Sequence, residues 1–137
     1  MSPLLLDTCA AIWIAEDEPI APEALAALDD AARDGMRVLI SPMSAWEVGL
    51  LVARGRLTLS MQPESWFRRL LSVPGVGLTE LAPEVLIASS NLPGTPPRDP
   101  VDRILAATAR SGGYRLVTRD RGLLDYADQG HVAAISC

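Results

Sequence analysis

Short apolar runs alternate with longer amphipathic segments from one end of the chain to the other. Each apolar run has the length of a buried β-strand, whereas the segments between them repeat their apolar residues at helical spacing. The predicted strands cover residues 4–6, 38–40, 76–81, 116–118 and 132–135. The predicted helices cover residues 8–15, 22–34, 64–71, 83–90, 101–111 and 122–127, and one more begins near residue 41 and runs to residue 54.

This alternation is typical of α/β folds, in which crossover helices join parallel strands. Turn residues agree with it, because Pro22 suits a first helical turn and Gly35 and Gly55 follow the ends of predicted helices. Residues 91–100 contain four prolines and one glycine, which predicts a loop. With 137 residues and no repeat or linker, the chain is predicted to form a single domain over residues 1–137.

The composition excludes several classes of enzyme. All 12 basic residues are arginine, so the chain lacks the lysine of phosphate-loop NTPases, pyridoxal enzymes and haloacid-type phosphatases. His131 is the one histidine, which excludes zinc sites built on two histidines. The net charge of −5 argues against passive binding of nucleic acid through a basic surface, although acids gathered at one place would still allow a metal-assisted site.

The cysteines and the hydropathy of the chain indicate its cellular compartment. Cys9 and Cys137 make no disulfide framework, and the apolar run at the amino terminus has no basic stretch and stops at Asp7. No stretch of 18 consecutive apolar residues occurs in the chain. These features predict a cytoplasmic protein that neither spans a membrane nor is secreted.

Two aspartates directly follow predicted strands. Asp7 comes after the leucine run and Asp120 comes two residues after the strand at 116–118. The carboxyl ends of the strands are where α/β sheets bind ligands, which favours a functional role for both side chains. The alternative is that each aspartate caps the helix that follows it.

Two further acids lie on predicted helix faces that are otherwise apolar. Glu47 has Met43, Leu50 and Leu51 as its neighbours at helical spacing. Asp102 likewise shares its face with apolar residues. Acidic side chains are almost never fully buried without a partner, so each one pairs with a cation, is protonated or lines a cleft.

Asp99 is interpreted differently, as the N-cap of the helix whose first residue is Pro100. Capping would also account for Asp102, which then lies in the first turn. If Asp7, Glu47, Asp102 and Asp120 do converge, each pair of charges about 4 Å apart repels by roughly 4 kcal/mol at an effective dielectric of about 20. Such a cluster requires a cation or protonation.

A cation held by oxygen ligands alone is expected to be Mg²⁺, with Mn²⁺ as its substitute. Mg²⁺ joins carboxylates to substrate phosphates, which suits attack of water on a phosphodiester. The hydroxyls of Ser44 and Thr118 would orient ligands or water there, with helix capping as the alternative for Ser44.

Four segments together resemble the PIN-domain family, and more narrowly its VapC-type toxins of prokaryotic toxin–antitoxin pairs. They are LLLDT (residues 4–8), SAWE (44–47), DPVDR (99–103) and VTRD (117–120). The resemblance implies a three-layer α/β/α domain with a central parallel sheet of four to five strands. It also implies an endoribonuclease that depends on Mg²⁺ or Mn²⁺.

The family's four acids fall on Asp7, Glu47, Asp102 and Asp120. The resemblance implies that the three aspartates hold the metal ion, directly or through water, and that Glu47 holds the metal or positions the attacking water. Thr118 matches the family's hydroxyl before the last acid. Asp99 belongs to an Arg-Asp-Pro stretch seen in a subgroup, which often has a histidine and a phenylalanine where this chain has Pro97 and Val101.

The resemblance further implies an RNA substrate, a cognate antitoxin protein and a homodimer. Arg98, Arg103 and Arg119 flank the last two acids and are candidates for contact with RNA phosphates, with a solvated surface role as the alternative. The alternative to a nuclease is a catalytically silent PIN-like domain whose acidic pocket binds a partner's arginines. Cys9 is expected to be a small buried hydrophobic residue and not a nucleophile.

Overall fold

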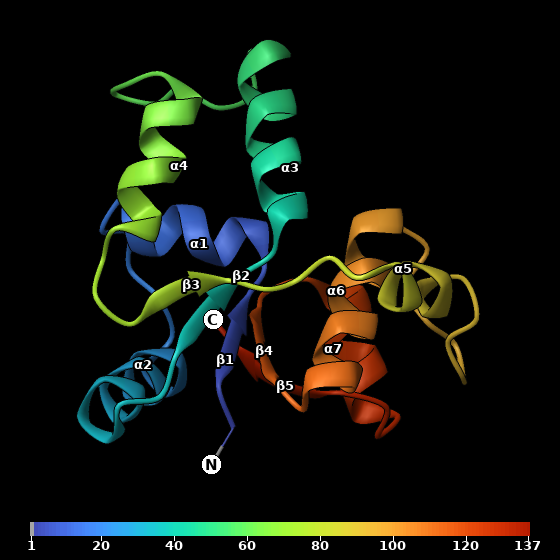
Figure 1. The fold of residues 1–137 in the computed structure, drawn as a ribbon. Coiled ribbons are helices and arrows are strands. Elements are labelled where there is room, and N and C mark those ends of the chain that lie inside the picture. The colour runs from blue at the N-terminus through green and yellow to red at the C-terminus, as the bar shows by residue number, and fades with distance from the viewer. Residues whose placement is uncertain (1) are drawn as a thin grey trace.

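The computed structural model describes residues 2–137, which form five strands and seven helices (Figure 1). The strands are β1 (Leu4–Leu6), β2 (Val38–Ile40), β3 (Val76–Leu78), β4 (Arg115–Thr118) and β5 (Ala133–Ser136). The helices are α1 (Thr8–Ala15), α2 (Pro22–Asp34), α3 (Pro42–Ala53), α4 (Pro63–Leu71), α5 (Pro83–Ser89), α6 (Pro100–Gly112) and α7 (Arg121–Asp128).

The strands form one parallel sheet in the order β3-β2-β1-β4-β5. The chain therefore runs outward from β1 through β2 to β3, crosses back to β4 on the other side of β1, and continues to β5. The carboxyl ends of β1 and β4 lie side by side, with Leu6 paired to Val117. This point, where the strand order reverses, is the place at which open α/β sheets form a crevice for ligands.

Alternating side chains of the central strands supply two separate cores. Leu4 and Leu6 of β1 pack with residues of α1–α4, while Leu5 between them packs with α6 and α7. In a strand, neighbouring side chains point to opposite faces, so the continuous leucine run is buried on both sides. Figure 1 shows α5, α6 and α7 grouped on one side of the sheet. The result is the predicted three-layer α/β/α arrangement with a parallel sheet.

Helix boundaries follow the local signals in the sequence. Prolines stand in the first turn of five helices, where the missing N–H costs nothing. Gly35 and Gly113 end α2 and α6 with positive φ angles of 68° and 70°, a conformation that glycine adopts without strain. The residues that begin α1, α3, α6 and α7 are hydrogen-bonding caps, namely Asp7, Ser41, Asp99 and Asp120.

One predicted strand is too long. The apolar pattern predicts a strand over residues 76–81, but β3 ends at Leu78. The amide of Thr79 still donates to the carbonyl of Ile40 at 2.9 Å, and the chain then turns away toward Pro83, which begins α5. Among residues 2–137, no helix combines the length and the apolar character that crossing a membrane requires.

Candidate functional site

Asp7 lies at the carboxyl end of β1 and is 6% exposed. One carboxylate oxygen, Oδ1, accepts a hydrogen bond of 2.7 Å from the amide of Ala10, so the residue caps α1. The other, Oδ2, accepts a bond of 2.5 Å from the hydroxyl of Thr118. Burial nevertheless raises the pKa of Asp7 above its ordinary value, against the lowering effect of these two bonds. The side chain is thus both a helix cap and a buried acid whose charged form is disfavoured by burial.

Thr118 joins the acids that follow the two central strands. Its hydroxyl donates to Asp7 and also accepts the amide of Asp120 at 3.0 Å. Asp120 in turn caps α7, because its Oδ2 accepts the amide of Leu123 at 2.9 Å. The side chain of Thr118 is fully buried. The predicted hydroxyl therefore lies between the two strand-end aspartates.

Glu47 approaches the same place from α3. Its Oε1 accepts a hydrogen bond from the hydroxyl of Thr8, the residue that follows Asp7. The Thr8 oxygen also lies 2.9 Å from the hydroxyl of Ser44, so Ser44 supports Glu47 through Thr8. Burial raises the pKa of Glu47, and the charges of Asp99 and Asp7 add to that effect.

This contact excludes the capping alternative for Ser44 and adds a residue that the sequence analysis did not single out. Ser44 does not cap its helix, because Ser41 does so through the amide of Met43 at 3.1 Å. The role of Thr8 was not predicted at all. Its only signal was its place directly after a strand-end aspartate, and the partner that gives it a function lies 39 positions away along the chain.

Asp99 and Asp102 lie at the start of α6. Asp99 caps this helix as predicted, with Oδ1 accepting the amides of Val101 at 2.9 Å and Asp102 at 3.1 Å. Asp102 is half-buried and is one turn into the helix. Its orientation is set by Val101 and Leu105, which are buried in the core beneath α6. The charges of Asp120 and Asp7, which follow β4 and β1, act on Asp102, so the start of α6 lies near the strand ends.

The acids act on one another electrostatically. The pKa of Asp102 is raised to about 7, first by burial and then by the charges of Asp120, Asp99, Asp7 and Glu47. Partial desolvation of the Cys9 thiol, although the residue as a whole is exposed, followed by the charges of three of these acids, likewise raises the pKa of the thiol to about 11. The four predicted carboxylates are therefore gathered within one local field, at the point where the strand order reverses.

The four carboxylates fit a hard divalent cation if some of them bind the ion through water molecules. Every candidate ligand is a carboxylate oxygen, the type that Mg²⁺ and Mn²⁺ prefer. Within residues 2–137, no three acidic, thiol or imidazole side chains are arranged to hold one ion directly between them. Mg²⁺ commonly binds through one or two carboxylates and keeps several waters, so wider spacing is compatible with it. A bound cation would also relieve the mutual repulsion of the acids.

A sequence model of the PIN domain matches residues 4–129, which is most of the chain and includes all four acids. This chain belongs to the PIN domain family. It is similar to Ribonuclease VapC22 of Mycobacterium tuberculosis (strain ATCC 25618 / H37Rv), with 34% identity over 125 residues that cover 90% of this chain and 91% of the relative.

Solved structures that contain VapBC proteins share the fold of this chain. One is the crystal structure of VapBC2 from Rickettsia felis bound to a DNA fragment from their promoter, with a TM-score of 0.70 and 15% identity over 97% of both chains. Another is DNA-bound VapBC from Salmonella typhimurium, with a TM-score of 0.66 and 18% identity over 99% of this chain and 98% of that chain. The α/β/α architecture predicted from the resemblance is confirmed.

The three candidate arginines of this PIN domain differ in their surroundings. Arg103 donates to the carbonyl oxygens of Ser89 at 2.9 Å and Pro97 at 3.2 Å, so its guanidinium fastens the loop before α6. Arg119 donates to the carbonyl of Cys137 and stacks 3.9 Å from the ring centroid of Trp13. Arg98 is exposed and has no hydrogen-bond or ion-pair partner among residues 2–137. Of the three candidate arginines, Arg98 alone makes no contact within residues 2–137 that would compete with binding of a substrate.

Cys9 is placed differently from the prediction. It is exposed, because it occupies the outward side of α1 while Ala10 and Ala11 face the core. Position alone, one residue after the buried Thr8, did not reveal this outward direction. The raised pKa keeps the thiol protonated at neutral pH, and its role stays a prediction.

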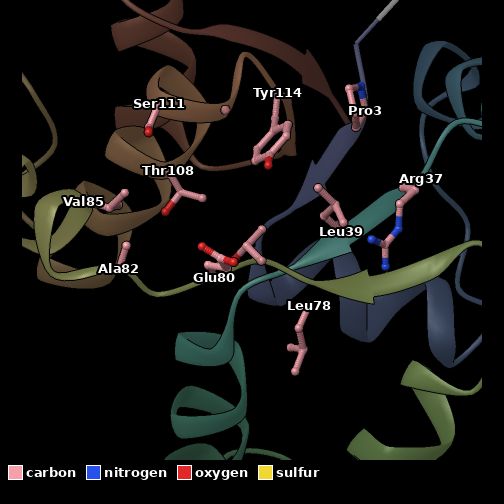
Figure 2. Close-up of a pocket in the computed structure, with 12 residues that line it drawn as sticks. Pro3, Arg37, Leu39, Leu78, Glu80, Ala82, Val85, Thr108, Ser111 and Tyr114 are labelled. Carbon is pink, nitrogen blue, oxygen red and sulfur yellow. The ribbon is translucent and has the colours of Figure 1, made fainter.

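A separate cavity of about 480 Å³ lies beside the sheet and is not lined by any of the four acids. Figure 2 shows Thr108, Ser111 and Tyr114 on one side of it and Leu39 and Leu78 of the strands on the other. The candidate site of this PIN domain is therefore the carboxylate cluster, distinct from this cavity.

Proposed function

We propose that this PIN domain is a metal-dependent endoribonuclease that hydrolyses RNA phosphodiester bonds and acts as the toxin of a toxin–antitoxin pair. The observation that carries the proposal is the convergence of Asp7, Glu47, Asp102 and Asp120 where the strand order reverses. The identity to Ribonuclease VapC22 over nine-tenths of the chain supports the same activity. The fold extends over residues 2–137, and we propose that it is a single domain.

Mg²⁺, with Mn²⁺ as its substitute, is the proposed cofactor. Asp7, Asp102 and Asp120 would hold it, directly or through water, and Glu47 would hold the metal or position the attacking water. When bound, the ion supplies charge stabilisation to the phosphodiester and lowers the pKa of water. Support comes from the oxygen-only donor set and from Asp102, whose pKa is raised to about 7 first by burial and then by the charges of the neighbouring acids.

The protein groups have distinct tasks in this proposal. Thr118 holds Asp7 in place and leaves its carboxylate ionisable, because the hydroxyl donates to the charged form. Thr8 occupies Oε1 of Glu47, so Oε2 is the oxygen that accepts a hydrogen bond from the attacking water. Arg98 contacts an RNA phosphate beside the cleaved bond. Asp99 supports the site by capping α6, the helix that carries Asp102.

A cognate antitoxin protein and a homodimer complete the proposal. Structural neighbours described as VapBC complexes support an antitoxin partner, since this chain has their fold. An acidic site is complementary to basic antitoxin residues. Trp46 on α3 is 57% exposed, and a large apolar side chain at the surface favours a protein contact. Light scattering of the purified chain, alone and with its antitoxin, tests both associations.

The experiment that tests the activity is cleavage of a mixed RNA pool by the purified chain with Mg²⁺, with Mn²⁺ or with EDTA. Asp7→Asn and Glu47→Gln are prepared in the same way, so that a contaminating nuclease would be present in all three samples. Asparagine is also an effective helix cap, so Asp7→Asn removes the charge and keeps the capping group. We expect metal-dependent cutting that each variant lowers on the order of 100-fold or more, because charge stabilisation at a metal site contributes several kcal/mol.

Equal cutting by all three proteins would contradict the assignment of the acids. Metal binding by the folded chain without cutting of any RNA, together with capture of an arginine-rich antitoxin segment, would instead favour a silent partner-binding domain. Circular dichroism of the variants excludes loss of fold as the reason for lost activity.

A further inference from the structure

The loop between α5 and α6 is fastened along the side of α7. It contains residues 91–99, runs past the carboxyl-terminal end of α7 and reaches the helix's amino-terminal end before α6 begins. Proline-rich loops without secondary structure are ordinarily mobile, and they gain fixed geometry only from contacts with packed elements. The contacts made by this loop are therefore informative about its task.

Two side chains at the end of α7 hold the first part of the loop. The amide group of Gln129 binds Thr95 at both backbone positions, with Oε1 accepting the Thr95 N–H at 2.9 Å and Nε2 donating to the Thr95 carbonyl at 3.2 Å. The hydroxyl of Tyr126 donates to the carbonyl of Pro93 at 2.6 Å. The ring of Tyr126 is fully buried, so this hydroxyl has a fixed position. We name Tyr126 and Gln129 the α7 clamp.

Close packing completes the attachment. Gly94 has a φ angle of +69°, and a Cβ atom there would lie 2.3 Å from Nε2 of His131 and 2.8 Å from Oε1 of Gln129. At the other end of α7, a Cβ on Gly122 would lie 3.4 Å from the Cβ of Pro97. Gly94 is required for the close approach, because a larger residue there would displace His131 and Gln129, whereas Gly122 and Pro97 are in ordinary contact.

The attached loop leads directly into the candidate site. The buried residue Pro97 is held by Arg103 through its carbonyl and packs next to Gly122, which is two residues from Asp120. The next residue is the exposed Arg98, followed by Asp99, whose charge contributes to raising the pKa of both Glu47 and Asp102. The backbone on both sides of Arg98 is thus held, by Arg103 at Pro97 and by the capping contacts of Asp99, and the α7 clamp holds the part of the loop that precedes them.

We propose that Tyr126 and Gln129 are positioning residues for substrate binding, because they hold residues 91–99 as a fixed wall that presents Arg98 to an RNA phosphate. This inference rests on the proposed nuclease function. The clamp touches neither substrate nor the four acids and acts through Arg98. Its contribution belongs to substrate affinity, since Asp102 is held independently by the core packing of α6.

The test compares Tyr126→Phe and Gln129→Met with the control Asp125→Asn. The first two keep side-chain volume and remove only the hydrogen bonds to the loop. The control lies on the outer face of α7, where Asp125 pairs with Arg121. KM and kcat are measured with an RNA that the wild-type chain cuts, and exchange of the Thr95 amide hydrogen is followed by NMR.

We expect Tyr126→Phe to raise KM about five-fold, the effect of one ordinary hydrogen bond. Gln129→Met removes two solvent-exposed bonds and should raise KM by a similar factor, and both variants should change kcat and metal dependence less than about two-fold. Thr95 exchange accelerates in both. In the Arg98→Ala background, which itself raises KM, Gln129→Met adds no further increase, because the clamp works through Arg98. Asp125→Asn matches the wild type in every measurement.

Unchanged KM with faster Thr95 exchange would overturn the inference, as would a lower kcat at constant KM, which indicates fewer folded molecules. Additive effects of Gln129→Met and Arg98→Ala would also overturn it. Failure of the proposed function gives a different result, in which the wild-type chain cuts no RNA with either metal. In that case unchanged RNA affinity of Gln129→Met, measured by fluorescence anisotropy, would overturn the clamp's role in substrate binding.

Discussion

Two threonines hold acids in this site, and they do so in different settings. Thr118 ends β4, is fully buried and connects Asp7 to the backbone of Asp120. Thr8 begins α1 and holds Glu47, which projects from α3 and is only half-buried. Both threonines donate to a carboxylate, but the first pair is enclosed and the second pair borders solvent.

This difference separates a fixed part of the site from an adjustable one. Both carboxylate oxygens of Asp7 are engaged by protein groups, and water has little access to replace a lost partner. Oε1 of Glu47 has one threonine donor, and nearby water can substitute for it. Asp7 at the strand end is held by a backbone amide and a buried hydroxyl, whereas Glu47 on the helix face has one hydroxyl donor and keeps more rotamer freedom.

Thr118→Val is expected to have the largest effect. The substitution leaves Oδ2 of Asp7 and the amide of Asp120 without their shared partner, and an unsatisfied buried group costs about 1–3 kcal/mol. We expect this loss in the free energy of unfolding, measured with urea. Nuclease activity is expected to fall roughly 10- to 100-fold, as with other groups that orient metal ligands.

Thr118→Ser is the matched control because it keeps the hydroxyl and loses only a methyl group. It is expected to retain most of the activity. Equal loss of activity in the serine and valine variants would show that packing, and not the hydrogen bond, is what the site requires from Thr118.

Thr8→Val makes the equivalent change on the helix side, and we expect a smaller effect. Water replaces the lost donor to Glu47, and Ser44 can turn its hydroxyl to a backbone carbonyl of its own helix. The free energy of unfolding should change by about 1 kcal/mol or less, and kcat should fall less than about ten-fold. An effect as large as that of Thr118→Val would remove the distinction between the two halves of the site.

Asp99→Ala is expected to have the smallest effect on activity. It removes the N-cap of α6, which costs about 1 kcal/mol of stability, but it leaves the four proposed metal ligands in place. Thermal unfolding is expected at a lower temperature, and kcat should stay within about two-fold of the wild type. Asp99→Asn keeps the cap and should restore the stability. A loss of kcat in both variants would instead place Asp99 among the metal ligands.

The fold was largely predictable because its signals are local. Strand length, helical periodicity and the prolines and glycines at element boundaries all act within a few residues, and β3 was overestimated only where the apolar run continued past the sheet. The resemblance to the PIN family is also confirmed. The roles of the individual site residues remain predictions, which the variants above test.

The local signals did not reveal contacts between residues that are distant in the sequence. The apolar context of Cys9 did not reveal that it points outward, and Ser44 was compatible with capping until the structure placed it against Thr8. Arg103 and Arg98 are chemically equivalent in the sequence, yet only the contacts with Ser89 and Pro97 commit the first of them to the loop.

The sequence by itself determined which acids were out of place, since an acid at a strand end or on an apolar helix face is visible from spacing alone. It also indicated Asp99 as the cap of α6 and left capping as the alternative for Asp7 and Asp120, which the structure shows to be caps as well. Only the tertiary structure decided that these acids share one electrostatic field and that α7 holds the loop beside them. The reason is physical: periodicity specifies which face of its own element a residue occupies, while the strand order sets which elements meet, and that order depends on packing over the whole chain.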